Sequence, residues 1–317
     1  MAIFLRDVEV SETLSMDQMI EKIESMQSYY GNGEASNLPR RKIISSGGML
    51  AVMGGGLFYE GVVGVKTYTV VKGQYSFQVS LYDAETGKLL CYTQANRLGQ
   101  LRTGATTAVA AKYLTHNPDV TVGIIGTGYQ AATQLEAVSK VRNITNIKAF
   151  SRTESSRKLF AENMSDALQV PVTAGASAEE TVRNSDIIIC IAATMEPVIN
   201  GEWLADGSTL IAAGPTTWRA KEVDSLTLTR SEKIVVDSID QAPNESGDLS
   251  NAVDQGIIQW SQLVELRYVV SGKQSGRDNK DQIIYTKLMG TGVADVAAAK
   301  LAYDTAKRLG VGTEMDW

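Results

Sequence analysis

Residues 121–138, with the sequence TVGIIGTGYQAATQLEAV, place the strongest constraint on what this chain can fold into. A β-branched run, Val122 to Ile125, leads into a Gly-x-Gly-x-x-Ala turn, and a helix-forming segment follows. In this strand–turn–helix context the pattern is typical of dinucleotide binding, because the turn and the helix N-terminus present N–H groups to a pyrophosphate. The segment predicts a site for NAD or NADP formed by Gly126, Thr127, Gly128, Tyr129, Gln130 and Ala131.

The chain after Val120 alternates between apolar strand-like runs and helical or short connecting segments. This alternation predicts an α/β fold, a Rossmann-type doubly wound parallel sheet. A long helical stretch, roughly Asp281 to Leu309, is expected to close the chain. The expected strands are 121–126, 147–151, 171–174, 187–192, 209–213 and 233–237.

The part of the chain before the dinucleotide segment has a different pattern. Ser15 to Tyr30 has apolar residues at helical spacing and predicts an amphipathic helix. Residues 42–95 contain apolar runs and alternating segments around a turn at 84–87, which predicts an antiparallel sheet. We therefore expect a second, α+β domain beside the Rossmann-type one.

Two basic residues of this first part stand out. Lys66 lies inside the apolar strand GVVGVKTYTV, where a lysine either reaches the strand edge or faces a polar cleft. Arg102 directly precedes a helix rich in small residues, with Thr103 as its expected N-cap. An arginine at a helix N-terminus is suited to binding a carboxylate through its planar fork.

The second strand of the Rossmann-type domain bears on cofactor choice. An acidic residue about 20 positions after the glycine turn would bind the ribose 2′-OH of NAD. Phe150 is instead followed by Ser151, Arg152 and Thr153, which are suited to a 2′-phosphate. We therefore predict that NADP is preferred over NAD; the alternative is that Arg152 is a solvated loop residue and NAD is used.

Bulk properties exclude several other functions. A net charge of -6 and a pI near 5.1 give no basic surface for nucleic acid or an anionic membrane. The N-terminus lacks signal-peptide features, and no apolar run approaches membrane length. Cys91 and Cys190 lie in apolar runs and are expected to be buried thiols, and a single histidine, His116, provides no metal cluster. These features predict a cytoplasmic enzyme without a metal site.

The ordered motifs of the chain resemble those of the ornithine cyclodeaminase/μ-crystallin family over nearly the whole length. The resemblance implies a dinucleotide-binding domain, residues 118–299, and a substrate-binding and dimerisation domain formed by residues 1–117 with 300–317. It implies a homodimer acting on a small imino or amino acid, since the family includes cyclodeaminases, alanine dehydrogenases, and ketimine and cyclic imine reductases. The motifs are GVKTYTV, QANRLGQLRTGATTAVAAKYL, VGIIGTGYQAATQLEAV, FSRTESSRKLFAE, ATMEPVINGEWLADGSTLIAAG, VVDSIDQAPNESGDL and GVADVAAAKLAYD.

The resemblance also implies roles for individual residues. The family's carboxylate-binding and catalytic basic residues fall on Arg41, Lys66 and Arg102; Arg40 is adjacent to Arg41, and the local register is loose. Lys66 is the expected proton donor. The implied cofactor contacts beyond the glycine turn and the residues after Phe150 are Thr103, Gly104, Ala192, Ala193 and Thr194.

One departure from the family pattern bears on the reaction. Cyclodeaminases carry an acidic residue two positions after the glycine that follows the strand TLIAAG, and this chain has Thr216 there, which we assign to substrate binding. Threonine is a poor acid or base for losing ammonia, whereas imine reduction needs only hydride, a carboxylate pocket and a proton donor. We expect an NAD(P)H-dependent reductase of a small 2-imino acid, reversible as an amino-acid dehydrogenase. The alternatives are a cyclodeaminase-type lyase and a non-catalytic binding protein like μ-crystallin.

Overall fold

The computed structural model describes residues 1–316, which form two compact units. The first unit comprises residues 1–105 and the chain from Gly290 onward, and the second comprises Thr106–Met289. The division falls inside α3 (Asn96–Leu114) and directly before α11 (Gly292–Leu309), where the sequence suggested residues 117 and 300. The whole of α11 belongs to the first unit because it packs against that unit's sheet and against α2 (Met16–Gly31).

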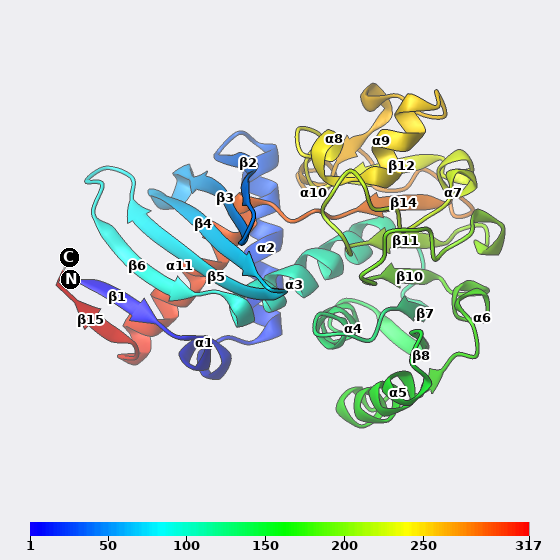
Figure 1. Cartoon of the computed structure of the whole chain (residues 1–317), viewed down its shortest axis with the longest axis horizontal. Coiled ribbons are helices and arrows are strands. Elements are labelled where there is room, and N and C mark those ends of the chain that lie inside the picture. Colours follow the sequence, from blue (N-terminus) through cyan, green and yellow to red (C-terminus); the bar gives the residue numbers. More distant parts are fainter. Residues whose placement is uncertain (317) are drawn as a thin grey trace. The chain divides into compact units, whose positions relative to one another are not determined.

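The first unit contains a seven-stranded sheet in the order β15-β1-β6-β5-β4-β3-β2 (Figure 1). Neighbouring strands are antiparallel except β1 and β6, which are parallel. The expected antiparallel sheet is therefore present. Its strands are β1 (Ala2–Leu5), β2 (Ala35–Ser45), β3 (Gly48–Leu57), β4 (Val62–Val71), β5 (Gln74–Asp83), β6 (Leu89–Gln94) and β15 (Thr313–Met315).

Helices α1 (Asp7–Thr13), α2 and α11 complete the first unit, with a single 3-10 turn at Phe58–Glu60. The predicted amphipathic helix is α2. The side chain of Ser15 caps it by accepting from the backbone N–H of Gln18, and its apolar stripe is buried. Helix α11 lies close to β3, since a Cβ added to Gly55 would be 2.5 Å from the Cα of Val293. Glycines in β3 thus bring α11 within reach of residues on the sheet.

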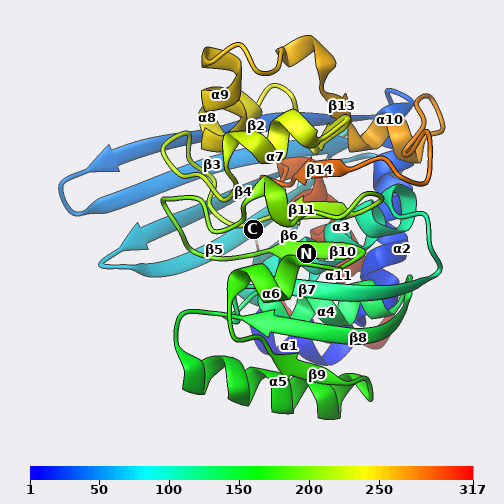
Figure 2. The ribbon, with the colours of Figure 1, turned by 90° about the vertical axis from the view of Figure 1, so that its right-hand side faces the viewer.

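The second unit contains an eight-stranded parallel sheet in the order β13-β12-β14-β11-β10-β7-β8-β9, with β9 and β13 at its edges (Figure 2). The predicted α/β class and doubly wound parallel sheet are confirmed. The six expected strands are β7 (Asp119–Ile125), β8 (Asn143–Phe150), β9 (Val172–Ala174), β10 (Ile187–Cys190), β11 (Thr209–Ala212) and β12 (Lys233–Val236), and the others are β13 (Val264–Glu265) and β14 (Ile284–Lys287).

Helices and 3-10 turns connect these strands. They include α4, which follows the glycine turn directly, and α9, which packs near the end of β14. The elements are α4 (Ala131–Ser139), α5 (Glu154–Leu168), α6 (Ala178–Val182), α7 (Ser225–Arg230), α8 (Ala242–Glu245), α9 (Gly247–Asp254), α10 (Leu266–Val270) and the 3-10 turns Gly201–Trp203 and Trp260–Gln262.

The helix predicted from Asp281 to Leu309 is wrong in its first part. Ile284–Lys287 is β14, fully buried between β11 and β12, and α11 begins only at Gly292. Gly290, with φ of +78°, interrupts the chain between the two elements. A short apolar run fits a buried strand as well as a helix, so periodicity alone did not separate them.

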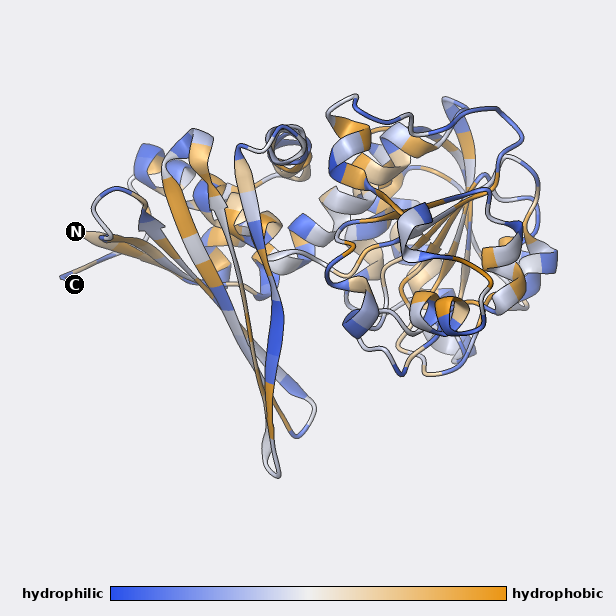
Figure 3. Cartoon of the chain, turned by 90° about the horizontal axis from the view of Figure 1, so that it is seen from above, coloured by the Kyte–Doolittle hydropathy of each residue, from blue (hydrophilic) through white to orange (hydrophobic). Residues whose placement is uncertain are grey.

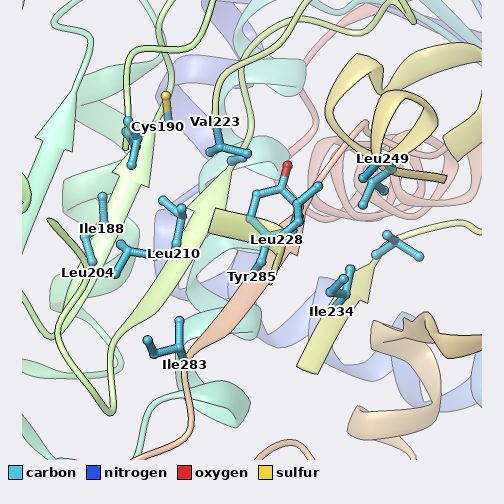
Figure 4. Packing of buried hydrophobic residues seen from close by; sticks show 14 of the residues in the cluster. Ile188, Cys190, Leu204, Leu210, Val223, Leu228, Ile234, Leu249, Ile283 and Tyr285 are labelled. Carbon is cyan, nitrogen blue, oxygen red and sulfur yellow. The ribbon is translucent and has the colours of Figure 1, made fainter. Parts of the chain in front are cut away.

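The core of the second unit is formed by apolar side chains from the parallel strands and the helices packed on them (Figures 3 and 4). Tyr285 of β14 and Cys190 of β10 lie in it, and both carry polar atoms into this core. Cys91 and Cys190 are free and buried, as predicted. Within residues 1–316, none of the helices has the length and hydropathy needed to cross a bilayer.

Candidate active site

The glycine turn lies where the order of the parallel sheet reverses. From β7 the chain runs outward to β8 and β9, and it then returns to β10 on the other side of β7. In open parallel sheets, ligands bind at the carboxyl ends of the strands at such a switch point. The segments that leave β7, β10 and β8 at this edge are 126–130, 191–194 and 151–153. Together they contain eleven of the predicted cofactor residues, from Gly126 to Gln130, from Ser151 to Thr153 and from Ala192 to Thr194, and Ala131 begins α4.

Two glycines of the turn have different structural roles. Gly126 has φ of +106°, and a Cβ there would lie 2.8 Å from the backbone of Ile191, so its lack of a side chain is required for folding. A Cβ on Gly128 would meet no atom within 4 Å, so this position is open. Ala131, fully buried, begins α4, which directs its N-terminus toward the same turn. An open glycine before a helix N-terminus is what a dinucleotide pyrophosphate requires.

The residues expected to bind the ribose follow β8. Ser151 accepts a hydrogen bond of 2.8 Å from the hydroxyl of Thr127, which ties the segment to the glycine turn. Arg152 is exposed directly after it. The structure therefore places Ser151 beside the glycine turn and Arg152 on the surface directly after it.

The expectation that Thr103 caps a helix is wrong. Helix α3 begins at Asn96, and Arg102, Thr103 and Gly104 lie inside it. The hydroxyl of Thr103 donates 2.7 Å to the carbonyl of Gly99, one turn back. The helix start is instead bound by Asp7, whose carboxylate accepts from the N–H of Arg97 at 2.9 Å and from the side chain of Asn96. A cap from a residue so distant in sequence leaves no local signal.

Lys66 and Arg102 converge on one carboxylate. The Nζ of Lys66, on β4, lies 2.9 Å from Oδ1 of Asp295, and the Nε of Arg102, on α3, lies 2.8 Å from the same oxygen. All three side chains are buried, and Asp295 is completely so. The strand lysine therefore faces a polar site within the first unit and not the strand edge. The two basic residues singled out in the sequence form one cluster.

Asp295 was missed in the sequence. It stands on α11 in the segment GVADVAAAK, where an acid among small apolar residues on a buried helix face was the available signal. Its second oxygen, Oδ2, is buried and makes no hydrogen bond within residues 1–316. Burying the ionised carboxylate of Asp295 at this position would cost free energy without the two cations.

The cluster shifts the pKa values of its members. Burial lowers the pKa of Lys66 to about 8, an effect that Arg102 and Arg40 add to and that Asp295 opposes. Burial alone would raise the pKa of Asp295, but Arg102 and Lys66 outweigh it and lower the pKa. A lysine with a pKa of about 8, beside a carboxylate that stays ionised, is suited to donating a proton.

Arg40, and not Arg41, lies with this cluster. Arg40 is buried, its Nη2 donates 3.4 Å to the carbonyl of Gly290, and it lies over the ring of Tyr68. The Arg41 side chain is exposed. The two residues sit beside an irregularity in the pairing of β2 with β3, between Leu38 and Arg41, which is why the register could not be assigned from sequence. The substrate role of Arg41 stays a prediction from the family resemblance.

The charges of the cluster favour an anion. Arg40, Lys66 and Arg102 carry three positive charges against the single negative charge of Asp295, which leaves an excess of two. Arginine and lysine side chains of this kind bind carboxylates through charge-assisted hydrogen bonds. The arrangement is therefore suited to a small carboxylic acid.

Thr216 lies on the segment that follows β11. It is partly buried, as are its neighbours from Gly214 to Thr217, while Trp218 is exposed with Arg219 over its ring. Residues 40–56 are mostly paired strand in the β2–β3 hairpin.

The sequence matches the profile of the ornithine cyclodeaminase/mu-crystallin family over residues 2–309. The chain belongs to this family. A Delta(1)-pyrroline-2-carboxylate reductase of Bacillus cereus is 33% identical over 263 residues, which cover 80% of this chain and 81% of the relative. The solved Delta(1)-pyrroline-2-carboxylate reductase of Thermococcus litoralis, in complex with NADH and L-proline, is 33% identical with a TM-score of 0.94 and covers 99% of this chain and 100% of that one.

A third relative is an archaeal alanine dehydrogenase, described as a dimer with bound NAD. It is 29% identical to this chain, has a TM-score of 0.94, and covers 100% of this chain and 99% of its own. The fold found in both units is thus that of oxidoreductases of the ornithine cyclodeaminase/mu-crystallin family. The resemblance seen in the sequence is confirmed.

Proposed function

We propose that this protein is an NAD(P)H-dependent reductase of a small 2-imino acid that gives an L-amino acid, and that it runs in reverse as an amino-acid dehydrogenase. The observation that carries the proposal is the buried cluster in which Lys66 and Arg102 share Oδ1 of Asp295. A lysine with its pKa near 8 beside a carboxylate-binding arginine supplies what imine reduction asks of the protein.

The side chains divide the work as follows. Arg102 is fixed by its Nε on Asp295, and its terminal nitrogens bind the substrate carboxylate, with added positive charge from Arg40. Lys66 delivers a proton to the imine nitrogen as the C=N double bond is reduced to CH–NH. A nicotinamide cofactor held at the glycine turn would supply the hydride for the imine carbon. Asp295 orients both cations and keeps Lys66 protonated to a higher pH than burial alone would allow.

The cyclodeaminase alternative is weaker. Losing ammonia from a diamino acid needs an acid/base group at the position where this chain has Thr216. A non-catalytic binding protein, the other alternative, has no need of a buried lysine whose pKa is lowered to about 8. We therefore place imine reduction first, with the five-membered cyclic imine carboxylate as the first substrate to test because two relatives bear that activity in their names.

The preference for NADP over NAD rests on Arg152. It stands directly after Ser151, which is tied to the glycine turn, and no acidic residue occupies this segment. Thr103 and Gly104 remain proposed cofactor contacts on α3, and Arg41 a proposed substrate contact.

A homodimer is also proposed. The long β2–β3 and β4–β5 hairpins of the first unit expose apolar side chains, as a protein–protein contact would. An archaeal relative is described as a dimer. The exposed residues are Ile43, Ile44, Val71 and Tyr75. Light scattering should give twice the mass of one chain, and I44K should give a monomer; a monomeric wild type would contradict the proposal. The two free buried cysteines suit the proposed cytoplasmic location.

The activity is tested by a substrate screen. Cyclic imine carboxylates, and 2-oxo acids with ammonia or methylamine, are supplied with NADPH or NADH, and oxidation of the reduced cofactor is followed. We expect turnover of at least one imine. Formation of proline and ammonia from L-ornithine with NAD present would instead support the cyclodeaminase alternative. Tight substrate binding without turnover would support the binding-protein alternative.

A further inference from the structure

Glu222 and Lys287 form an ion pair that is completely buried in the second unit, outside the cluster around Lys66. Lys287 is the last residue of β14, and Glu222 follows the segment that leaves β11. Burial of two opposite charges is weak evidence for stability, because the desolvation cost can exceed their attraction. A contribution to stability therefore does not explain why this ion pair is buried.

The contacts of the pair indicate a role in holding a neighbouring backbone segment. Oε1 of Glu222 accepts from the backbone N–H of Gly214 at 3.1 Å, and Nζ of Lys287 donates to the carbonyl of Pro215 at 3.3 Å. The ion pair thus binds the backbone N–H of Gly214 and the backbone carbonyl of Pro215, which are successive residues. These residues begin the segment that carries Thr216. A Cβ on Gly214 would lie 2.5 Å from Oε1 of Glu222, so the backbone sits directly on the carboxylate.

Other buried groups fix the pair itself. Oδ1 of Asp248, on α9, accepts from the backbone N–H groups of Glu222 and Val223 at 2.7 and 3.0 Å. Its Oδ2 lies 3.8 Å from Nζ of Lys287 and accepts 3.2 Å from the hydroxyl of Tyr285. The titratable groups around the pair are therefore Asp248, Tyr285 and the Cys190 thiol. Burial raises the pKa of that thiol, and the charge of Glu222 raises it further.

We propose that the Glu222–Lys287 pair is a positioning device that holds the 214–218 segment in the conformation that contacts the imino-acid substrate. This inference rests on the proposed function and on the assignment of Thr216 to substrate binding, which was made from the family pattern. Neither residue touches the reacting atoms; each acts through the backbone of Gly214 or Pro215. The pair uses both charges because one backbone group needs an acceptor and the next needs a donor.

The test is a graded set of variants. K287M removes the donor to Pro215, E222A removes the acceptor for Gly214, and E222Q keeps an oxygen acceptor in nearly the same shape. Loss of a charged hydrogen bond to the segment should raise KM for the imine about tenfold in K287M and E222A, with kcat and the dinucleotide Kd little changed. E222Q should rescue most of the KM. The control is K233M, which breaks the 2.9 Å ion pair of Lys233 with Asp278 at the opposite end of the same sheet.

Hydrogen exchange gives a readout that does not depend on turnover. The amides of Gly214, Thr216 and Trp218 should exchange faster in K287M and E222A than in the wild type, while those of the glycine turn at 126–131 stay unchanged. A lower melting temperature with unchanged KM and no local change in exchange would overturn the inference, since it would show a purely structural pair. If K287M does not fold, E222Q and E222A decide the question.

The two proposals fail in different ways. A wild type that reduces none of the imines contradicts the proposed function, and the exchange data then still show whether the pair holds the segment. Faster local exchange combined with an unchanged KM contradicts only the substrate role of the segment.

Discussion

The Nζ of Lys66 lies 2.9 Å from Oδ1 of Asp295, and both side chains are buried in the first unit. One carboxylate oxygen serves a lysine from the sheet and an arginine from a helix. The charge state of Lys66 therefore depends on a residue more than two hundred positions away in the chain. This relationship makes the pH dependence of the reaction a sensitive test of the site.

The rate of imine reduction should fall as pH rises through the pKa of Lys66. Because burial lowers that pKa to about 8, Lys66 is protonated below this pH and loses its proton above it. We expect log kcat/KM to decline above about pH 8, approaching a tenfold loss per pH unit. D295N removes the carboxylate that raises the pKa of Lys66 against the effect of burial. The decline in kcat/KM of this variant should therefore begin at lower pH. Comparing both enzymes on one substrate cancels the titration of the substrate; coincident profiles would contradict the pairing.

Arg102 and Lys66 should respond to substitution differently. R102K keeps the charge but loses the planar fork, so it should raise KM roughly tenfold to a hundredfold, the equivalent of about 1.5–3 kcal/mol. K66M keeps the length and loses the proton, so kcat should fall by about a hundredfold or more while KM changes less. Steady-state kinetics with a saturating cofactor separate the two effects. A near-normal kcat in K66M would make Lys66 a structural residue.

Substitution of Gly290 should affect substrate binding through Arg102, in addition to straining the backbone. A Cβ there would lie 2.8 Å from Nη1 of Arg102, and the residue has φ of +78°. Gly33 has a similar φ of +86°, but open space around it. G290A and G33A should both lose stability on the order of 1 kcal/mol from backbone strain. Only G290A should raise KM for the imine. Equal KM values in the two variants would show that the guanidinium can move aside.

Alanine substitutions at the two glycines of the dinucleotide turn should have different effects. A methyl group on Gly128 meets open space, so G128A should fold with an unchanged melting temperature but bind NADPH and NADH more weakly. G126A meets the backbone of Ile191 and should lower the melting temperature. Calorimetry and cofactor titration check both. Normal cofactor affinity in G128A would show that the pyrophosphate does not approach this residue.

We expect Arg152 to decide the cofactor preference. The wild type should bind NADPH more tightly than NADH, because a guanidinium favours the extra phosphate. R152D should reverse the order by repelling that phosphate and binding a ribose hydroxyl. Fluorescence titration with each reduced cofactor measures both affinities. Equal or tighter NADH binding by the wild type would mean that Arg152 points away from the ribose.

The sequence predicted the features that depend on local pattern. The glycine turn, the parallel strands and the stripe of α2 follow from short-range periodicity and turn chemistry, and each is present. What could not be predicted depends on contacts between distant residues. Asp7 caps α3 from another helix, and Asp295 reaches Lys66 from α11, which packs on the sheet.

The β14 error has a related cause. Ile284–Lys287 is apolar enough for either a helix or a strand, and its place between β11 and β12 is decided by the rest of the sheet. The irregular register between Leu38 and Arg41 likewise decides that Arg40 turns inward. No window of sequence around these residues contains that information.

The position of Asp295 on α11 has a consequence for the order of folding during synthesis. The ribosome completes the second unit, which ends at Met289, before it makes α11 or β15. Until then the nascent first unit holds the two cations of the cluster without their counter-charge, and the partner strand of β1 does not yet exist. A chain truncated before Asp295 should therefore contain a protease-resistant dinucleotide-binding unit and a protease-sensitive N-terminal one. The reactive centre would be the last part of the protein to become native.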